Sequence, residues 1–321
     1  MRYIIIGAGA VGGSIGGRLV EGGHQVVLVA RGAHYSALRD QGLRLSTPDG
    51  TRTVAVAVAS GPHEVESRPD DVLVMAVKTQ HAVAALDEWS TEHGDSPVLC
   101  AQNGVVGEVM AARRFREVYG MCVWLPSTHL RPGHVVANCA PLTGILHLGR
   151  YPRGTGELAH RIAADLEKSY FAAPVVEDVM RWKYAKLLSN LGNAVDAVLG
   201  PDAPDSADLL RQVRAEGRVV LDAAGIDYVS EAEQAAVRGD RMRARSVDGI
   251  VHSGSSSWQS LMRGTGSIEA DYLNGEIVLL ARKYGIPAPL NELLQRTANT
   301  FARESRAPGS ISAQQLLARL D

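Results

Sequence analysis

The feature that most constrains this chain is a glycine pattern directly after a short apolar run. Residues 3–6 read YIII, a β-rich stretch, and residues 7–12 then read GAGAVG. This is G-x-G-x-x-G between a predicted strand and a predicted helix, and the run HQVVLVAR at 24–31 supplies a second strand. The order strand, glycine turn, helix, strand predicts a βαβ unit that binds the pyrophosphate of a dinucleotide.

Each glycine of this motif has a physical role in such a site. Gly7 allows the tight turn, Gly9 lets the backbone approach a pyrophosphate, and Gly12 permits close packing of helix against strand. The start of the helix adds N–H donors and the positive end of the helix dipole. We therefore predict that the cofactor is bound by the loop residues Gly7, Ala8, Gly9, Ala10, Val11 and Gly12.

The end of the second predicted strand indicates which dinucleotide is bound. Sites for NAD or FAD usually have Asp or Glu there, which hydrogen-bonds the ribose hydroxyls. This chain instead reads VARG at 29–32, with Arg31 at that place. A guanidinium suits a 2′-phosphate through bidentate, charge-assisted bonds, so the sequence predicts NADPH. The alternative is an ordinary surface arginine, since only five of the 33 basic residues are lysines.

Two further predicted strands end in polar residues. Lys78 follows VLVMAV at 72–77, and Asn103 lies in CAQNG at 100–104. Both would lie at the sheet edge that the cofactor crosses, because ligands of open α/β sheets bind at the carboxyl ends of the strands. The alternatives are a solvated strand end for Lys78 and a turn residue for Asn103.

The pattern of the chain changes near residue 175. Before it, strands alternate with helices, and residues 42–58 read as a hairpin around TPDG. Beyond it nearly every segment has helical periodicity. We therefore predict an α/β N-terminal Rossmann domain with a mostly parallel sheet over residues 1–175. An all-helical domain for substrate binding or dimerisation would follow over residues 176–321, with the ligand at the strand ends that face it.

Composition narrows the class of protein. The net charge is −2 and the chain is 45% hydrophobic, which gives no reason to expect a nucleic-acid or membrane partner. Cys100, Cys122 and Cys139 have spacings that match no metal motif, so we expect no metal and reduced, buried thiols. We see no signal peptide and no apolar run of the ~18–20 residues that span a bilayer, and we expect a cytoplasmic protein.

The segment RWKYAKLLSNLGNAV at 181–195 reads as a helix with one apolar face and a narrow polar stripe. At about 100° per residue, Lys186, Asn190 and Asn193 fall within roughly 60° of arc, and Lys183 extends the row. No carboxylate stands at i+4 to pair with Lys186. The stripe therefore indicates donors for an anionic, oxygen-rich ligand, and the alternative is a solvated surface stripe.

Several of these features occur together in one family. The chain resembles the ketopantoate reductase (2-dehydropantoate 2-reductase) family, and the likeness extends over nearly the whole chain. The matching segments are GAGAVG at 7–12, Arg31, Lys78 in AVKT, QNG at 102–104, Lys186 with Asn190, and SIEADYLNGEIVLLARKYGIPAPLN at 267–291. The resemblance implies an NADPH-dependent reductase with a Rossmann domain, a helical second domain and an active site in the cleft between them.

The resemblance also implies roles for individual residues. Lys186 would be the general acid, and Glu269 would lie at the junction of cofactor and substrate as a second catalytic residue. Further contacts to the cofactor would come from Lys78, Asn103 and the backbone of Leu130. Contacts to the substrate would come from Asn103, Asn190, Asn193, Ser255 and Ser256, with a serine holding the substrate carboxylate.

This chain departs from the family where substrate would bind. The family's second Asn follows the catalytic lysine by eight residues, but here Ala194 stands there and Asn193 is one residue early. Trp258 occupies a place where a smaller side chain is common, and one extra residue precedes Glu269. The extra residue leaves three alternatives for the serine that holds the carboxylate: Ser255, Ser256 and Ser257.

We therefore expect reduction of 2-dehydropantoate to pantoate, with hydride from NADPH and a proton from Lys186, which would stabilise the charge growing on the carbonyl oxygen. Lys183, one turn earlier, is the rival proton donor. One alternative is a reductase of another 2-oxo acid or an imine, and a second is a non-catalytic NADP-binding regulatory protein. The expected partner is a small-molecule 2-oxo acid, and a homodimer is left open.

Overall fold

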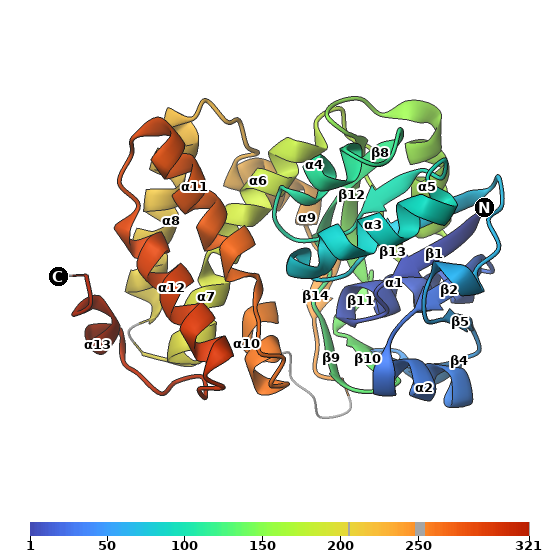
Figure 1. Ribbon diagram of the computed structural model, residues 1–321, viewed down its shortest axis with the longest axis horizontal. Coiled ribbons are helices and arrows are strands. Elements are labelled where there is room, and N and C mark those ends of the chain that lie inside the picture. Colours follow the sequence, from blue (N-terminus) through green and yellow to red (C-terminus); the bar gives the residue numbers. More distant parts are fainter. Residues whose placement is uncertain (205, 248–253, 321) are drawn as a thin grey trace. The chain divides into compact units, whose positions relative to one another are not determined.

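The computed structural model describes residues 1–204, 206–247 and 254–320 (Figure 1). The chain forms two compact units, the first made of Met1–Lys183 with Ser230–His252 and the second of Tyr184–Val229 with Ser253–Asp321. The boundary lies within helix α6 (Val179–Asn190). Residues 230–252 fell in the predicted helical domain, but they contain strand β14 (Met242–Ala244), which pairs with β11 (Cys139–Pro141) of the first unit.

The first unit has a large, mostly parallel sheet at its centre, as the sequence predicted. Its pairs are parallel except for the one between β12 and β8. Side by side, its described strands are β13 (Phe171–Ala172), β12 (Gly144–Arg150), β8 (Val118–Trp124), β7 (Val98–Cys100), β6 (Asp71–Met75), β1 (Arg2–Ile6), β2 (Gln25–Val29) and β5 (Ala57–Ala59).

A smaller sheet accompanies it. The predicted hairpin around TPDG is confirmed, with β3 and β4 antiparallel, and β10 extends the sheet by pairing parallel to β3. The order of its described strands is β4 (Gly50–Val54), β3 (Leu43–Thr47), β10 (His134–Ala137) and β9 (Ser127–Arg131). The helices of the first unit are α1 (Ala10–Glu21), α2 (Gly32–Gln41), α3 (Ala82–His93), α4 (Gly107–Ala112), α5 (Gly156–Glu167) and α9 (Glu231–Arg238), with short 3₁₀ helices η1 (Pro62–Glu64) and η2 (Thr79–His81).

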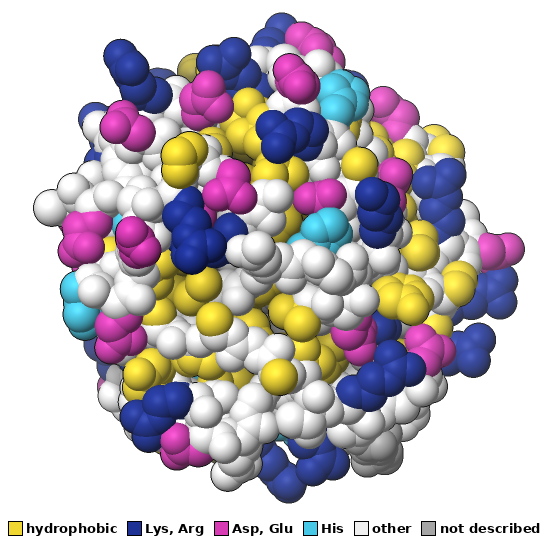
Figure 2. All heavy atoms as spheres, turned by 90° about the vertical axis from the view of Figure 1, so that its right-hand side faces the viewer, with side chains coloured by type: hydrophobic (Ala, Val, Ile, Leu, Met, Phe, Trp, Pro, Cys, Tyr) yellow, Lys and Arg dark blue, Asp and Glu magenta, His cyan; other side chains and the backbone are white. Residues whose placement is uncertain are grey.

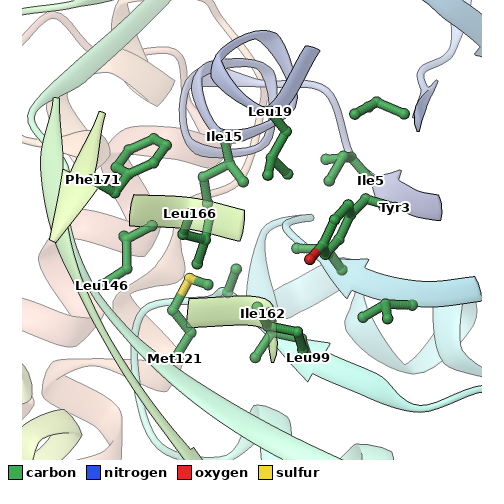
Figure 3. Close-up of a cluster of buried hydrophobic side chains, with 14 of the residues drawn as sticks. Tyr3, Ile5, Ile15, Leu19, Leu99, Met121, Leu146, Ile162, Leu166 and Phe171 are labelled. Carbon is green, nitrogen blue, oxygen red and sulfur yellow. The ribbon is translucent and has the colours of Figure 1, made fainter. Parts of the chain in front are cut away.

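Helices cover both faces of the large sheet because its central strands are apolar on both sides. In β1, Tyr3 and Ile5 point to one face, where side chains of α1 and α5 meet them (Figure 3). Ile4 and Ile6 point to the other face, where they pack with Leu86 and other residues of α3. This two-sided burial explains why the strand reads as a continuous apolar run rather than an alternating one.

Helix α1 lies between the two sheets, and its glycines make that possible. A Cβ placed on Gly16 would come within 2.5 Å of the Leu28 side chain in the large sheet. A Cβ on Gly13 would come within 2.7 Å of Val135 in the small sheet. Since nearly all real Cβ contacts are longer, the glycines bring the helix axis close to both layers.

The second unit is helical. Its elements are the C-terminal half of α6, then α7 (Gly192–Leu199), α8 (Ser206–Ala223), α10 (Ser256–Met262), the 3₁₀ helix η3 (Glu269–Tyr272), α11 (Asn274–Tyr284), α12 (Pro289–Arg303) and α13 (Ala313–Leu317). Helix α11 ends at Gly285, which takes the left-handed conformation with φ 69°. Gly217 on α8 lets that helix approach α6, because a Cβ there would lie 3.0 Å from the Leu188 side chain.

One face of the protein is mixed in charge. On the face shown in Figure 2, Lys and Arg side chains are interspersed with Asp and Glu, and neither sign forms a continuous field among the described side chains. In the part of the chain that the structure describes, no helix combines the length and the apolar character needed to cross a bilayer.

Candidate active site

The glycine loop joins β1 to α1 as the motif predicts. Gly7 has φ +103°, a conformation that other residues rarely adopt, and a Cβ there would lie 2.8 Å from the Val77 backbone nitrogen. The amides of Gly7 and Ala8 both donate to the Val29 carbonyl, at 3.2 and 3.0 Å. A Cβ on Gly9 would meet nothing within 4 Å, so this glycine leaves open space in front of the helix start. Open space at the start of a helix, where the first amides have no acceptor within the helix, suits a pyrophosphate.

A histidine that the sequence reading missed supports this loop. The His34 Nε2 lies 2.7 Å from the Ala8 carbonyl oxygen, and the Gly133 amide donates to His34 Nδ1 at 2.9 Å. Since the carbonyl can only accept, Nε2 carries a proton. Since Nδ1 accepts from the Gly133 amide, it carries none, and the ring is neutral. His34 thus ties the loop to the turn between β9 and β10. No sequence signal was available, because its partners are backbone groups at residues 8 and 133.

Lys78 and Asn103 follow β6 and β7; β6 lies next to β1 in the sheet, and β7 lies next to β6. Both side chains are half-buried. Their loops are joined, since Gln102 donates to the Val77 carbonyl at 2.8 Å and Thr79 donates to the Asn103 carbonyl at 3.3 Å. The structure therefore brings both residues to the strand ends beside the glycine loop.

Arg31 stands at the end of β2 and precedes α2. Its side chain is 73% exposed, and its Nη2 lies 2.5 Å from the Glu88 Oε2 of α3. Leu130, the other residue given a cofactor contact by resemblance, is 45% exposed and lies in β9, against which α1 packs. The exposed guanidinium at this strand end can turn toward a phosphate, and to do so it must loosen its pairing with Glu88.

In the second unit the predicted polar row lies on α6 and α7, which follow one another almost without interruption. Lys186 is half-buried, Asn190 is buried and Asn193 is half-buried. The Asn274 side chain donates at 3.2 Å to the carbonyl of Leu191, the residue between the two helices. That bond fixes the junction from which Asn190 and Asn193 project.

A buried amide network holds Asn274 in turn. Its Nδ2 donates at 3.0 Å to Asn291 Oδ1, and the Asn291 amide group donates at 2.8 Å to Glu216. Both asparagines lie in the segment 267–291 that carries the family resemblance, but no role was predicted for either. Their function as supports becomes visible only when residues 191, 274 and 291 are seen together.

The structure separates the three candidate serines. Ser255 is the N-cap of α10, where its hydroxyl accepts from the Trp258 amide at 3.3 Å and donates to the Asn193 carbonyl at 3.1 Å. Ser257 is buried. Ser256 is half-buried, and the Asn193 side chain donates to its hydroxyl at 3.4 Å. Ser256 and Asn193 therefore form one polar pair, while Ser255 acts as a helix cap.

A carboxylate lies beside this pair. Asp196, one turn after Asn193 on α7, hydrogen-bonds Ser255. Burial raises the pKa of the Asp196 carboxyl, and the bonds from Ser255 oppose that rise. The sequence reading did not single out Asp196. Its place at i+3 from Asn193 was the signal that could have found it.

Glu269 is the first residue of η3 and is 3% exposed. It belongs to the same unit as Lys186, Asn190, Asn193 and the serine segment. A carboxylate so deeply buried requires polar or charged neighbours.

Lys183, the rival proton donor, belongs to the first unit. Its ammonium forms an ion pair with Glu108 of α4, and the two side chains are 2% and 0% exposed. Burial raises the pKa of the Glu108 carboxyl, and Lys183 opposes that rise. Lys183 is therefore not part of a solvated surface stripe. It neutralises a buried carboxylate.

The predicted residues thus form two groups. The glycine loop, Arg31, Lys78 and Asn103 lie at one edge of the first unit, and Lys186, Asn190, Asn193, Ser256 and Glu269 lie in the second. Among the described residues, no group of His, Cys, Asp and Glu is arranged to hold a metal ion.

Two models of one protein family match the chain. The one described as "Ketopantoate reductase PanE/ApbA" matches residues 3–153, and "Ketopantoate reductase PanE/ApbA C terminal" matches residues 178–302. The 2-dehydropantoate 2-reductase of Pyrococcus horikoshii is 27% identical over 328 residues, which cover 97% of this chain and 100% of that one.

Solved structures resemble the chain over a similar length. A PanE/ApbA family ketopantoate reductase from Ralstonia eutropha JMP134 matches with a TM-score of 0.78 and 28% identity, covering 95% of this chain and 100% of that one. A D-mandelate dehydrogenase solved with NADH and anilino(oxo)acetate gives a TM-score of 0.80 at 19% identity, covering 96% and 100%, and so shares the fold.

Proposed function

The chain belongs to the ketopantoate reductase family, and from that premise we propose that it reduces 2-dehydropantoate to pantoate with NADPH. The observation that carries the proposal is the pair of family matches, which include both the glycine loop and the helix of Lys186. Members of the family are oxidoreductases of 2-oxo acids, so a non-catalytic regulatory role is set aside.

The residues of the first unit fit a nicotinamide dinucleotide. Gly9 leaves room for the pyrophosphate at the start of α1, and Lys78 and Asn103 lie at the two adjoining strand ends. The choice of NADPH over NADH rests on Arg31, whose guanidinium offers the 2′-phosphate several charge-assisted hydrogen bonds. When bound, the reduced nicotinamide supplies hydride to the 2-oxo carbon.

The residues of the second unit supply the remaining chemistry. Negative charge grows on the carbonyl oxygen as its carbon is reduced, and we assign its stabilisation and protonation to the Lys186 ammonium. Asn190 and Asn193 bind substrate oxygens through neutral amides. Ser256, whose hydroxyl is paired with Asn193, holds the carboxylate. Glu269 orients these groups from its buried position.

One observation favours the alternative of another 2-oxo acid or an imine. Asn193 stands one residue earlier than the family's second Asn, and the half-buried carboxyl of Asp196 lies one turn further along α7. A carboxyl group close to the substrate contacts would favour a substrate with an amino group there, where ketopantoate has a hydroxyl. The homodimer and the cytoplasmic location stay predictions, and sedimentation velocity of the purified chain tests the first.

Steady-state kinetics of Lys186→Ala beside the parent test the proposal. We expect NADPH consumption with ketopantoate in the parent and a fall in kcat of ~10²–10⁴-fold in the variant, which lacks the proton donor. Lys168→Ala is the matched control, because Lys168 is an exposed lysine of the first unit. A panel of other 2-oxo acids and imines distinguishes the alternative substrates. Unimpaired turnover in Lys186→Ala would refute the assignment of the acid.

A further inference from the structure

The cation assigned to the 2′-phosphate is already engaged by a carboxylate. Arg31 Nη2 lies 2.5 Å from Glu88 Oε2, and the two side chains are 73% and 35% exposed. Glu88 is on α3, 57 residues further along the chain. The ion pair therefore lies across the end of β2, at the place where the sequence pattern predicts a nucleotide phosphate.

Glu88 is held close to this strand end from a second direction. A Cβ on Gly61, just beyond β5, would lie 3.1 Å from Glu88 Oε1. Strand β5 is the neighbour of β2 in the sheet, and the Ala30 amide donates to the Ala59 carbonyl at 3.1 Å. The carboxylate thus lies against the carboxyl ends of both strands.

Other charges on α3 are placed differently. The neighbouring Asp87 pairs with Arg114, which follows α4 in the chain. Glu92, one turn after Glu88, is exposed. Of these three carboxylates, Glu88 is the one in contact with Arg31.

Resting on the proposed function, we infer that Glu88 sets the preference between NADPH and NADH by competing with the 2′-phosphate for Arg31. A phosphate that binds the guanidinium must displace the carboxylate or lie beside it, and two like charges at such a distance repel. NADH has a hydroxyl in place of the phosphate and meets no such competition. Glu88 therefore weakens NADPH binding selectively and brings the two affinities closer together.

The size of the effect follows from exposure. Because both side chains are partly solvated, the competition is that of a surface ion pair, and we expect removal of the Glu88 charge to tighten NADPH binding roughly two- to fivefold at low salt. The gain shrinks as salt is added, since the screening length falls from ~30 Å at 0.01 M to ~3 Å at 1 M.

The test compares dissociation constants of NADPH and NADH for the full chain, measured by fluorescence titration without turnover. The variants are Glu88→Gln, Arg31→Ala and the double variant, with Glu92→Gln as the matched control for loss of one charge from α3. We expect Glu88→Gln to tighten NADPH alone, Glu92→Gln to change neither constant, and Glu88→Gln to have no effect once Arg31 is alanine.

The outcomes separate the inference from the function on which it rests. If Arg31→Ala weakens NADPH while Glu88→Gln leaves it unchanged or weakens it too, the inference is overturned and the NADPH assignment stands. If the parent binds neither nucleotide, or Arg31→Ala alters neither constant, the cofactor assignment fails and the inference fails with it.

Discussion

Two alanine substitutions in the glycine motif should have opposite consequences, although each adds the same single carbon. A Cβ on Gly9 meets nothing within 4 Å, and the residue has φ −71° and ψ −157°, at the edge of the extended region that alanine adopts. A Cβ on Gly12 would lie 2.1 Å from the Gly7 carbonyl oxygen. Gly9→Ala should therefore spare the fold and block the ligand, and Gly12→Ala should damage the fold itself.

The magnitudes follow from these distances. Ordinary contact begins at 3.4 Å, and 3.4 Å less 2.1 Å means that the Gly12 Cβ must gain 1.3 Å against backbone. Overpacking of that kind lowers the free energy of unfolding by about 1–3 kcal/mol. For a domain of this size, each kcal/mol lowers the melting temperature by roughly 2–4 °C. Gly9→Ala should stay within about 1 kcal/mol of the parent, since a lower entropy of the unfolded chain offsets a poorer N-cap.

The assay pairs thermal unfolding, followed by circular dichroism, with NADPH titration. We expect Gly9→Ala to melt close to the parent and to bind NADPH at least about tenfold more weakly, because the methyl group fills the space assigned to the pyrophosphate. Gly23→Ala is the matched control, since Gly23 has φ +82° with open space around it. That variant should lose some stability to backbone strain and keep its affinity.

Two results would refute this reasoning. Undiminished NADPH affinity in Gly9→Ala would mean that the dinucleotide does not cross the start of α1. A parent-like melting temperature in Gly12→Ala would mean that the contact with Gly7 relaxes freely and that the packing account is wrong.

Two further predictions concern buried titratable groups. Lys183→Met leaves Glu108 buried without its cation, so urea unfolding at pH 7 should show a loss of stability of about 3–5 kcal/mol. Because burial raises the folded-state pKa of this carboxyl, the loss should diminish as the pH falls and vanish only below the ordinary pKa of 4.5, where the carboxyl is protonated in both states; an unchanged midpoint at pH 7 would contradict it. Burial lowers the pKa of His147, which stacks on Trp182 at 3.8 Å, to about 4. The unfolded chain therefore binds a proton at His147 more readily than the folded chain does. As the pH is lowered from 6.5 to 4, the free energy of unfolding should fall by up to ~1.4 kcal/mol per pH unit because of this residue. Urea titrations of His147→Phe should lack this contribution to the slope.

The sequence by itself determined the elements whose signals are local. The glycine loop, the βαβ unit and the polar row on α6 and α7 are each contained in a short segment with its own periodicity or turn chemistry. Arg31, Lys78 and Asn103 were predictable for a related reason. Parallel strands present their carboxyl ends at one edge, so a strand-by-strand reading is enough to group the residues that follow them.

Only the tertiary structure decided which groups support or oppose these residues. His34 bonds the glycine loop, Asn274 fixes the junction of α6 and α7, and Glu88 pairs with Arg31, all across long sequence separations. The strand at 242–244 likewise joins the first unit through a partner at 139–141. Such contacts depend on where separate elements meet, and side-chain spacing along one element carries no information about that.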